Sequence, residues 1–339
     1  MKAQVLKQII KLDENPEPLE LVNTAVPKPG SKQILVKVLA CGICHTELDE
    51  IEGRIKTNLP IILGHQIVGK VESSGSDATK FRVDDRVGIA WINSACGKCY
   101  FCKRGNENLC NQFQATGCDV NGGYAEYTVV SEDFAYPIPE RFTDLNAAPL
   151  LCAGAIGWRA LKLTGIQDSE TLALYGFGAS AHIVIQIVKY KFPNSKVFVF
   201  TRSKGDLPSQ LAKEEGADWL GVTGEDPPEK YKRAIDTTPI GIPVREALRN
   251  LEKGGRLVMN LIRKETPIPE LDYVKHLWQE KEVKSVANIT RKDVQEFLPL
   301  AAKIPIIPEV EEFKLEEANK ALIALKNGKY RGAGVLRIS

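Results

Sequence analysis

The feature that most constrains this chain is a glycine turn between a short apolar run and an amphipathic segment. Residues 171–175 predict a β-strand, and residues 179–191 predict a helix. The turn region reads Gly176-Phe177-Gly178-Ala179-Ser180-Ala181, the G-x-G-x-x-A form of the dinucleotide-binding fingerprint. Gly176 permits the tight turn, Gly178 lets the backbone approach a pyrophosphate, and Ala181 keeps the helix close to the sheet. This strand–turn–helix setting predicts a nucleotide-binding βαβ unit.

The chain after this turn continues in the same rhythm. Apolar runs at 196–200, 233–236 and 256–261 alternate with a helical segment at 209–215. Strands that alternate with helices are typical of βαβ units and of a parallel, doubly wound sheet. We therefore expect an α/β fold.

The first third of the chain has a different texture. Short β-branched runs at 34–39, 67–72 and 85–92 are separated by turns rich in Gly, Pro, Ser and Asn, which predicts an antiparallel, barrel-like β-domain. Residues 147–163, rich in Ala and Leu, predict one helix between the β-rich part and the part in which strands and helices alternate. The expected domain boundaries lie near residues 150 and 288.

Four cysteines occur close together in the β-rich part. Their spacing is C-x2-C-x2-C-x7-C, formed by Cys96, Cys99, Cys102 and Cys110. Four thiolates so close can converge on one tetrahedral ion. The ferredoxin pattern for an iron–sulfur cluster ends with a gap of about three and a proline, whereas here the gap is seven and Asn111 follows. Zinc is favoured, and with four cysteine ligands the site should be structural.

A second ligand set is spread over the sequence. Cys44 follows a predicted strand, His65 precedes another, and Cys152 lies in the first long helical segment. Each alone is more often a core residue than a ligand. Together they indicate a Cys2His zinc site with an open fourth position, which is typical of catalytic zinc.

The end of the second strand bears on the choice between NAD and NADP. An acidic residue there would hold the adenosine ribose hydroxyl. This chain instead has Thr201-Arg202-Ser203-Lys204, with no carboxylate before Asp206. Arg202 can pair with a 2′-phosphate, which favours NADP(H), although Arg202 and Lys204 as ordinary solvated loop charges remain the alternative.

Composition excludes several classes of protein. Lys+Arg 45 against Asp+Glu 43 gives a formal charge of +2, which disfavours a dedicated nucleic-acid or membrane-surface protein. No apolar run approaches the ~20 residues needed to span a bilayer, and the start carries no signal-peptide core. We expect a cytoplasmic protein with no nucleic-acid or membrane partner.

Taken together, these motifs resemble the zinc-containing alcohol dehydrogenases of the medium-chain dehydrogenase/reductase superfamily, and most of all the cinnamyl-alcohol-dehydrogenase-like branch. The segments that match in order are Gly42-Ile-Cys-His-Thr, Leu63-Gly-His, the four-cysteine lobe, Leu151-Cys-Ala-Gly-Ala, Tyr175-Gly-Phe-Gly-Ala-Ser-Ala-His182, Thr201-Arg-Ser203 and Ser285-Val-Ala-Asn288. The resemblance covers essentially the whole chain. It implies a GroES-like catalytic domain at 1–150 with a structural-zinc lobe at 93–112, a Rossmann domain at 151–288, and a return to the catalytic domain at 289–339.

The resemblance also implies roles for individual residues and an active site in the cleft between the domains. Cys44, His65 and Cys152 would bind the catalytic zinc, and the cysteine lobe a second, structural zinc. Thr46 would hydrogen-bond the alcohol and begin a proton relay, while His45 would lie near the cofactor pyrophosphate. Dimers and tetramers are both usual in such families, so we expect a homodimer or homotetramer.

Departures from the family pattern concern the catalytic site. Gln66 follows the motif histidine where the family usually has Glu, so the ion should be more electrophilic or coordinate differently. Glu47 stands where Asp is common and is expected to support His65. Asp49 occupies the relay position that is often His, and a carboxylate there has a lower reference pKa. Arg331 is displaced by two positions from the usual arginine and is left without a role.

The expected reaction is reversible hydride transfer between a primary alcohol, which is aromatic, allylic or aliphatic, and NAD(P), with zinc as the Lewis acid. A polyol or sugar-alcohol dehydrogenase is the alternative within enzymes. A cofactor-binding homologue with lost catalysis is the third possibility, because of Gln66 and Asp49. A non-catalytic nucleic-acid-binding zinc module is disfavoured by the balanced charge.

Overall fold

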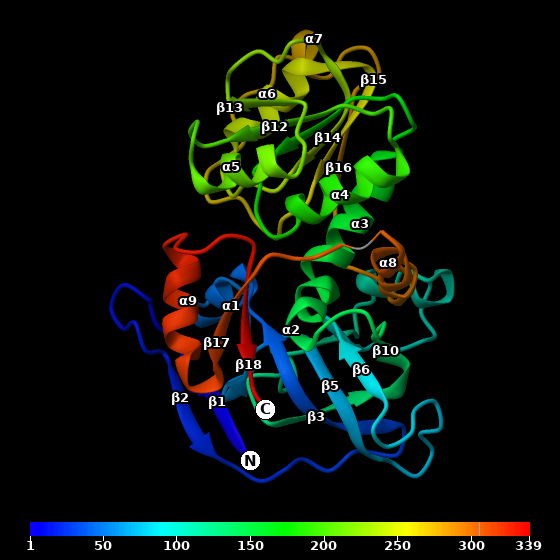
Figure 1. Cartoon of the computed structure of the whole chain (residues 1–339), viewed down its shortest axis with the longest axis vertical. Helices are drawn as coiled ribbons and strands as arrows, with labels where there is room; N and C mark the ends of the chain where they lie inside the picture. Colours follow the sequence, from blue (N-terminus) through cyan, green and yellow to red (C-terminus); the bar gives the residue numbers. More distant parts are fainter. Residues whose placement is uncertain (305) are drawn as a thin grey trace. The chain divides into compact units, whose positions relative to one another are not determined.

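The computed structural model describes residues 1–304 and 306–339, which form two compact units. The first unit consists of Met1–Cys152, Asn288–Ala302 and Ile307–Ser339. The second consists of Ala153–Ala287 together with Lys303, Ile304 and Ile306. The last segment of the chain thus returns to the unit in which the chain begins (Figure 1).

The first unit is built on a mixed sheet with strand order β10-β6-β5-β3-β18-β17, to which β9 adds by pairing with β3. A second sheet has the order β2-β1-β4, and β7 pairs with β8. The bounds of these strands are β1 (Lys2–Leu6), β2 (Leu19–Asn23), β3 (Gln33–Gly42), β4 (Ile61–Ile62), β5 (Gln66–Ser74), β6 (Arg86–Ile89), β7 (Ile92–Ser94), β8 (Gln114–Ala115), β9 (Tyr127–Ser131), β10 (Ala135–Pro137), β17 (Val310–Lys314) and β18 (Ala333–Arg337).

Helices of the first unit are short, apart from two near its C-terminus. They are α1 (His45–Ile51), α2 (Asp144–Ala147), α8 (Arg291–Lys303) and α9 (Ala318–Lys326), with 3-10 turns at Cys102–Arg104, Glu107–Leu109, Glu132–Phe134, Ala148–Leu151 and Leu315–Glu317. Apolar side chains of β3, β5 and β18 fill the core between the sheets and α9. None of the helices in the described ranges, 1–304 and 306–339, is long and apolar enough to cross a bilayer.

The pairing of β3 with β5 positions two segments that matter for the site. Their antiparallel register sets Gly42 opposite Gln66, so the chain leaves β3 toward Cys44 beside the place where it enters β5 from His65. Gly64, just before His65, has φ +93, a left-handed conformation that suits glycine. A Cβ on Gly122 would lie 2.1 Å from the Gly64 carbonyl oxygen, so two backbones pack directly against each other here.

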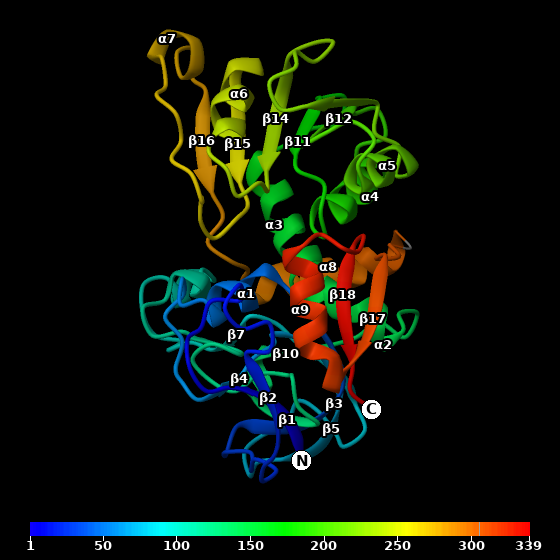
Figure 2. The same ribbon diagram turned by 90° about the vertical axis from the view of Figure 1, so that its left-hand side faces the viewer.

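The second unit is a parallel sheet with strand order β13-β12-β11-β14-β15-β16. In Figure 2 the strands from β16 to β12 lie side by side. The bounds are α3 (Ala153–Thr164), β11 (Leu172–Tyr175), α4 (Ala181–Lys191), β12 (Val197–Thr201), α5 (Leu207–Glu214), β13 (Trp219–Val222), β14 (Tyr231–Asp236), α6 (Ile242–Asn250), β15 (Leu251–Met259), α7 (Tyr273–His276) and β16 (Glu282–Ser285). Numbered within the unit, this is the order 3-2-1-4-5-6 of the Rossmann fold, and ligands of such sheets bind at the carboxyl ends beside the point where the order reverses.

Aromatic side chains fill one face of this sheet. Tyr175 stacks on Phe200 with ring centroids 4.2 Å apart, and Trp219 meets the edge of Phe200 at 5.1 Å. The apolar runs predicted as strands therefore bury large rings against the helical layer, the burial that stabilises a sheet covered on both faces.

Two predicted elements are each divided into separate elements in the structure. The single helix expected over 147–163 is broken: α2 is followed by the 3-10 turn Ala148–Leu151, and Cys152 (φ −127, ψ −76) separates that turn from α3. Pro149 near the start of the turn lacks an N–H, which favours the tighter turn over a continuous helix. The strand expected over 85–92 is two strands, β6 and β7, which pair with different partners.

Four elements of the second unit escape the sequence pattern: β13, α6, and the short α7 and β16. Strand β13 contains Gly221, which weakens strand propensity. Helix α6 carries Pro243 in its first turn, where proline is tolerated but reads as a break.

Candidate active site and metal centres

Three side chains from distant segments converge in the first unit. Cys44 stands at the N-cap of α1, His65 directly precedes β5, and Cys152 lies at the break before α3. Their ligand atoms all lie within 4.8 Å of one another. The β3–β5 register brings Cys44 and His65 together, and the 3-10 turn before Cys152 turns its sulfur toward them, with Sγ 3.3 Å from Nε2 of His65.

The electrostatics of this cluster favour a cation. A hydrogen bond from the Cys152 thiol lowers the pKa of Cys44 well below its usual range, and the same bond raises the pKa of Cys152 well above it. Both cysteines are half-buried. A divalent ion bound there would displace thiol protons and neutralise both thiolates, which is how thiolate ligand sets bind zinc.

Glu47 orients the histidine of the set. Its carboxylate is fully buried; Oε2 accepts the Cys44 backbone N–H at 2.7 Å, and Oε1 lies 2.8 Å from Nδ1 of His65. Burial by itself lowers the pKa of His65, but the charge of Glu47 and the bond with Cys44 outweigh it and raise that pKa. With Nδ1 engaged by the carboxylate, Nε2 is left facing Cys152 as the metal-binding nitrogen. The expectation that Glu47 supports His65 agrees with this geometry.

The residues expected to handle the proton lie on α1. Thr46 is buried, with Oγ1 3.5 Å from Cys44 Sγ. Asp49, one turn later, is buried and forms an ion pair with Arg54 Nε at 2.5 Å. Arg54 also donates to the Leu48 carbonyl oxygen at 3.3 Å, so it holds the carboxylate against the end of the helix. His45 is exposed on the same helix.

Arg54 is a residue that sequence reasoning missed. No pattern links it to Asp49, because the contact forms only where the chain folds back after the last turn of α1. The Gln66 side chain is buried against Gly42, since a Cβ on Gly42 would lie 2.9 Å from Cδ of Gln66. Arg331, left without a role, binds Glu309 at 3.0 Å.

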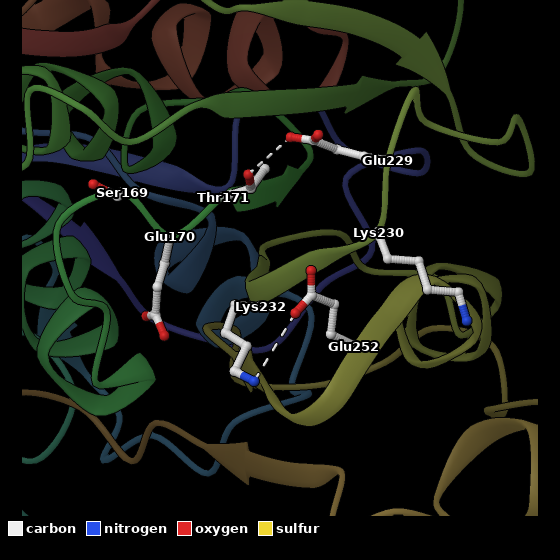
Figure 3. A pocket seen from close by; sticks show the side chains of 7 residues that line it. All are labelled: Ser169, Glu170, Thr171, Glu229, Lys230, Lys232 and Glu252. Atoms are coloured by element: carbon white, nitrogen blue, oxygen red, sulfur yellow. Dashed lines mark hydrogen bonds and ion pairs between the residues drawn. The ribbon is translucent and has the colours of Figure 1, made fainter.

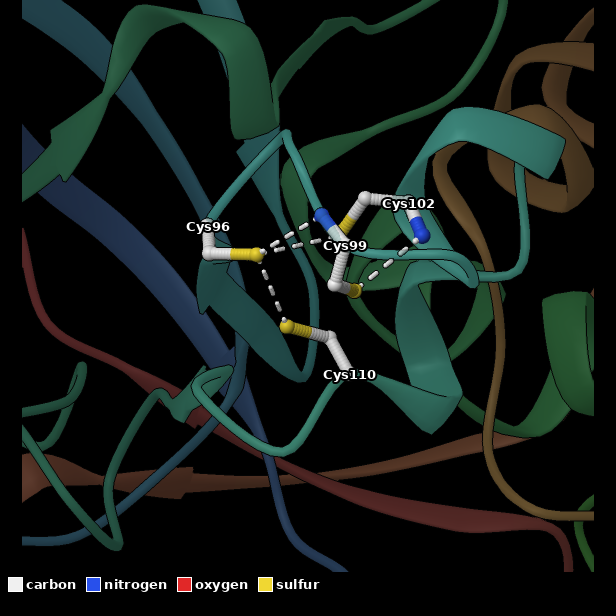
Figure 4. A group of neighbouring side chains, drawn as sticks. All are labelled: Cys96, Cys99, Cys102 and Cys110. Atoms are coloured by element: carbon white, nitrogen blue, oxygen red, sulfur yellow. Dashed lines mark hydrogen bonds between the residues drawn. The ribbon is translucent and has the colours of Figure 1, made fainter.

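The four-cysteine lobe forms a compact cage (Figure 4). The Cys96 sulfur lies 3.8 Å from that of Cys102 and 3.5 Å from that of Cys110, and it accepts the Cys99 backbone N–H at 3.4 Å. N–H groups of Lys98 and Cys99 lower the pKa of Cys96 to about 6, while burial raises that of Cys102 to about 12. Four sulfurs whose ligand atoms lie within 4.8 Å of one another fit a tetrahedral zinc ion, and the set offers no position for a substrate.

The glycine turn of the second unit has the geometry of a pyrophosphate site. Gly176 follows β11 with φ +83, and a Cβ there would lie 2.7 Å from Thr237 Oγ1. A Cβ on Gly178 would meet nothing within 4 Å, so the backbone is open to a ligand. The residues Phe177, Ala179 and Ser180 complete the turn, and α4 begins at Ala181, two residues later than the pattern predicts.

The loop after β12 carries the residues expected to select the cofactor. Thr201 ends the strand, and Arg202 and Ser203 are exposed. Asp206 accepts the Ser203 backbone N–H at 3.3 Å and caps α5 through the Ser209 N–H at 2.8 Å, so its carboxylate is already engaged. Within residues 1–304 and 306–339, the Arg202 side chain has no hydrogen-bond or ion-pair partner, whereas Lys204 pairs with Glu225 at 2.7 Å.

A pocket of about 390 Å³ lies elsewhere in the second unit, and its chemistry does not suit a substrate (Figure 3). It is lined by residues at the amino ends of β11, β14 and β15, the opposite edge from the glycine turn. Two pairs form within this lining: Thr171 donates to Glu229 at 3.3 Å, and Lys232 lies 3.9 Å from Glu252. Ligands of doubly wound sheets bind at the carboxyl ends of strands.

Comparison with known proteins agrees with this geometry. Residues 30–140 match the alcohol dehydrogenase GroES-like domain. A protein of Mycobacterium tuberculosis described as probable alcohol dehydrogenase AdhA is 41% identical over 327 residues, covering 95% of this chain and 93% of its own length. An alcohol dehydrogenase of Geobacillus stearothermophilus is 35% identical and matches over 100% of both chains.

A solved structure of similar architecture is a cinnamyl alcohol dehydrogenase of Sorghum bicolor. It has 25% sequence identity and a TM-score of 0.87, with 99% of this chain and 97% of that chain covered. The Rossmann strand order, the two ligand sets and the extent of these matches lead to one conclusion: the chain belongs to the zinc-containing alcohol dehydrogenases of the medium-chain dehydrogenase/reductase superfamily.

Proposed function

We propose that this chain interconverts primary alcohols and aldehydes with NADP(H), using one zinc ion at Cys44, His65 and Cys152. The observation that carries the proposal is the convergence of these three ligand atoms beside the buried hydroxyl of Thr46. A zinc ion held there supplies Lewis acidity, which lowers the pKa of an alcohol and polarises a carbonyl group.

The chain's own residues handle orientation and the proton. Thr46 accepts the proton of the alcohol hydroxyl and passes it along α1 toward Asp49. Arg54 fixes the position of the Asp49 carboxylate. Glu47 keeps the proton of His65 on Nδ1, so that Nε2 stays available as a ligand. The nicotinamide cofactor, when bound, would supply the hydride-transfer chemistry.

Aromatic or allylic substrates fit the surroundings of the ligand set best. The rings of Trp91 and His65 pack edge to face with their centroids 5.0 Å apart, so the indole of Trp91 lies beside the proposed zinc ligands. The cinnamyl alcohol dehydrogenase of Sorghum bicolor shares the fold over 99% of this chain. A polyol dehydrogenase is the alternative; turnover of sorbitol at a rate comparable with cinnamyl alcohol would favour it. Cofactor binding without turnover of any alcohol would instead identify a homologue that has lost catalysis.

The cysteine lobe is proposed to hold a second, purely structural zinc ion. We also propose the cytoplasm as the location, since in the part of the chain that the structure describes no cysteine forms a disulfide, and thiols persist in reducing compartments.

The ligand assignments predict different effects for two serine substitutions. Cys44→Ser should remove turnover and one zinc per chain while changing the thermal midpoint little, because α1 keeps its Glu47 cap. Cys99→Ser should lower the midpoint markedly, because the lobe loses the ion that closes it. Metal analysis, differential scanning calorimetry and aldehyde reduction on both variants test this. Full turnover by Cys44→Ser would overturn the catalytic site.

The cofactor preference rests on the unpaired guanidinium of Arg202. With cinnamaldehyde and benzaldehyde, kcat/KM should be higher with NADPH than with NADH. Arg202→Ala should lower the NADPH value about 10- to 100-fold, since charge-assisted hydrogen bonds contribute about 1.5–3 kcal/mol, and leave the NADH value nearly unchanged. Lys204→Ala is the matched control, because Lys204 already pairs with Glu225. A wild-type preference for NADH would reverse the assignment.

The relay role of Asp49 has its own test. In the wild-type enzyme, kcat plotted against pH should show no inflection near the reference pKa of histidine, about 6.5. Asp49→Asn should lower kcat about 10²-fold, the scale of general acid–base contributions. Glu52→Gln is the control, because Glu52 contacts the same Arg54 guanidinium without standing at the relay position. Equal rates for wild type and Asp49→Asn would discard the role.

The assembly is proposed to be a homodimer, or a tetramer built from it, through the free edge of the second unit's sheet. Strand β16 pairs only with β15 among the described residues, and all its residues are exposed. Glu282 already pairs with Arg256 of the same chain, so the contact between two antiparallel copies would rest on the backbone groups of this edge and on exposed Val283. Val274 and Trp278, which precede β16 in the chain, are also exposed.

Substitution at this edge should split the assembly. Val283→Asp places a charge in the middle of β16 and should reduce the mass measured by light scattering to that of one chain. Val83→Asp, at another exposed valine, should leave the mass unchanged. An unchanged mass for Val283→Asp, or a monomeric wild type, would contradict the proposal.

A further inference from the structure

A buried histidine stands at the start of α4, directly after the glycine turn. His182 is 0% exposed, and its ring Nδ1 lies 3.3 Å from the carbonyl oxygen of Gly178. The backbone N–H of His182 donates to the same oxygen at 3.2 Å. The other ring nitrogen, Nε2, is buried with no hydrogen-bond partner among the described residues.

These contacts fix which ring nitrogen carries the proton. A carbonyl oxygen only accepts, so Nδ1 of His182 must be the donor and Nε2 must hold a lone pair. A proton on Nε2 would place a charged N–H in the core without an acceptor. Burial accordingly lowers the pKa of His182 to about 4, and the ring is neutral at physiological pH.

The acceptor of this bond belongs to the glycine turn. Gly178 has no side chain, and a Cβ built on it would meet nothing within 4 Å, so no neighbouring group packs against that side of the residue. Its peptide nevertheless sets the direction of the N–H groups that follow it into α4, and those groups form the anion-binding end of the helix.

We propose that His182 is a positioning residue for the cofactor: its neutral ring, through Nδ1–H, holds the Gly178 carbonyl so that the turn presents its N–H groups to the pyrophosphate. The inference rests on the proposed function, which places the cofactor at this turn. It adds a residue that does not touch the ligand.

The chain contains a matched control for this contact. His276 in α7 makes the same bond one turn back, from Nδ1 to the Asp272 carbonyl oxygen at 2.9 Å, and it is also buried. Helix α7 lies at the amino ends of the strands, the end opposite the glycine turn. This follows from a hydrogen bond in which the backbone N–H of Gly254, near the start of β15, donates to Gln279, which comes just after α7 in the chain. Loss of the His276 bond should therefore affect stability without reaching the cofactor.

The experiment compares His182→Leu, His182→Asn and His276→Leu in full-length, zinc-loaded protein. Dissociation constants for NADPH and for NADH are measured by fluorescence, and KM for cofactor, KM for aldehyde and kcat by turnover. His182→Leu should raise the cofactor constants about fivefold, the scale of one neutral hydrogen bond, with kcat and aldehyde KM little changed. His182→Asn, whose amide N–H can replace Nδ1–H, should restore most of the affinity, and His276→Leu should leave it unchanged.

Two outcomes would overturn the inference: equal cofactor constants for His182→Leu and His276→Leu, or no rescue by His182→Asn. If wild type binds neither cofactor, the proposed function itself fails and the positioning role falls with it. Nitrogen NMR of histidine-labelled wild type, assigned with His182→Leu, reads the tautomer without any cofactor. The proton should be on Nδ1 of His182, and a proton on Nε2 would contradict the proposal in its own right.

Discussion

The first unit brings two thiols, an imidazole and a carboxylate together at one place, an arrangement that a bound cation would stabilise. Cys44, His65 and Cys152 bring two sulfurs and a ring nitrogen within 4.8 Å of one another, and Glu47 adds a fully buried carboxylate behind them. Uncompensated buried charges cost several kcal/mol each. The register of β3 against β5, the N-cap of α1 and the break before α3 all serve to hold this set together.

The second unit is proposed to bind the cofactor pyrophosphate at the glycine turn after β11. A parallel sheet with the order 3-2-1-4-5-6 leaves the turn after β11 free at the point where the order reverses. Because Gly176 and Gly178 have no side chains, the backbone of this turn is accessible to a ligand. The His182 ring adds a side-chain contact to this turn, at the Gly178 carbonyl oxygen, and we propose that this contact positions it for the cofactor.

Sequence reasoning succeeded where the chemistry is local. The glycine turn lies within a few residues, and the four-cysteine lobe within fifteen, so spacing alone predicted them, and the parallel sheet followed from the alternation of strands and helices. The grouping of Cys44, His65 and Cys152 is different, because no short motif links residues that lie up to about a hundred positions apart; it followed only when the three were considered together, and the family resemblance implied the same set. The break at Cys152 was missed, since Ala- and Leu-rich sequence around Pro149 reads as one helix. The Asp49–Arg54 pair was missed because it forms only when the chain reverses after α1.

We propose that the set of Cys44, His65 and Cys152 holds a catalytic zinc ion and that the four-cysteine lobe holds a structural one. One measurement tests this directly. A crystal of zinc-loaded protein measured at the zinc absorption edge yields an anomalous difference map. The account predicts two peaks per chain, one about 2.3 Å from four sulfurs of the lobe, and one bonded to Cys44, Cys152 and Nε2 of His65. A single peak, or a second peak away from His65, would contradict it.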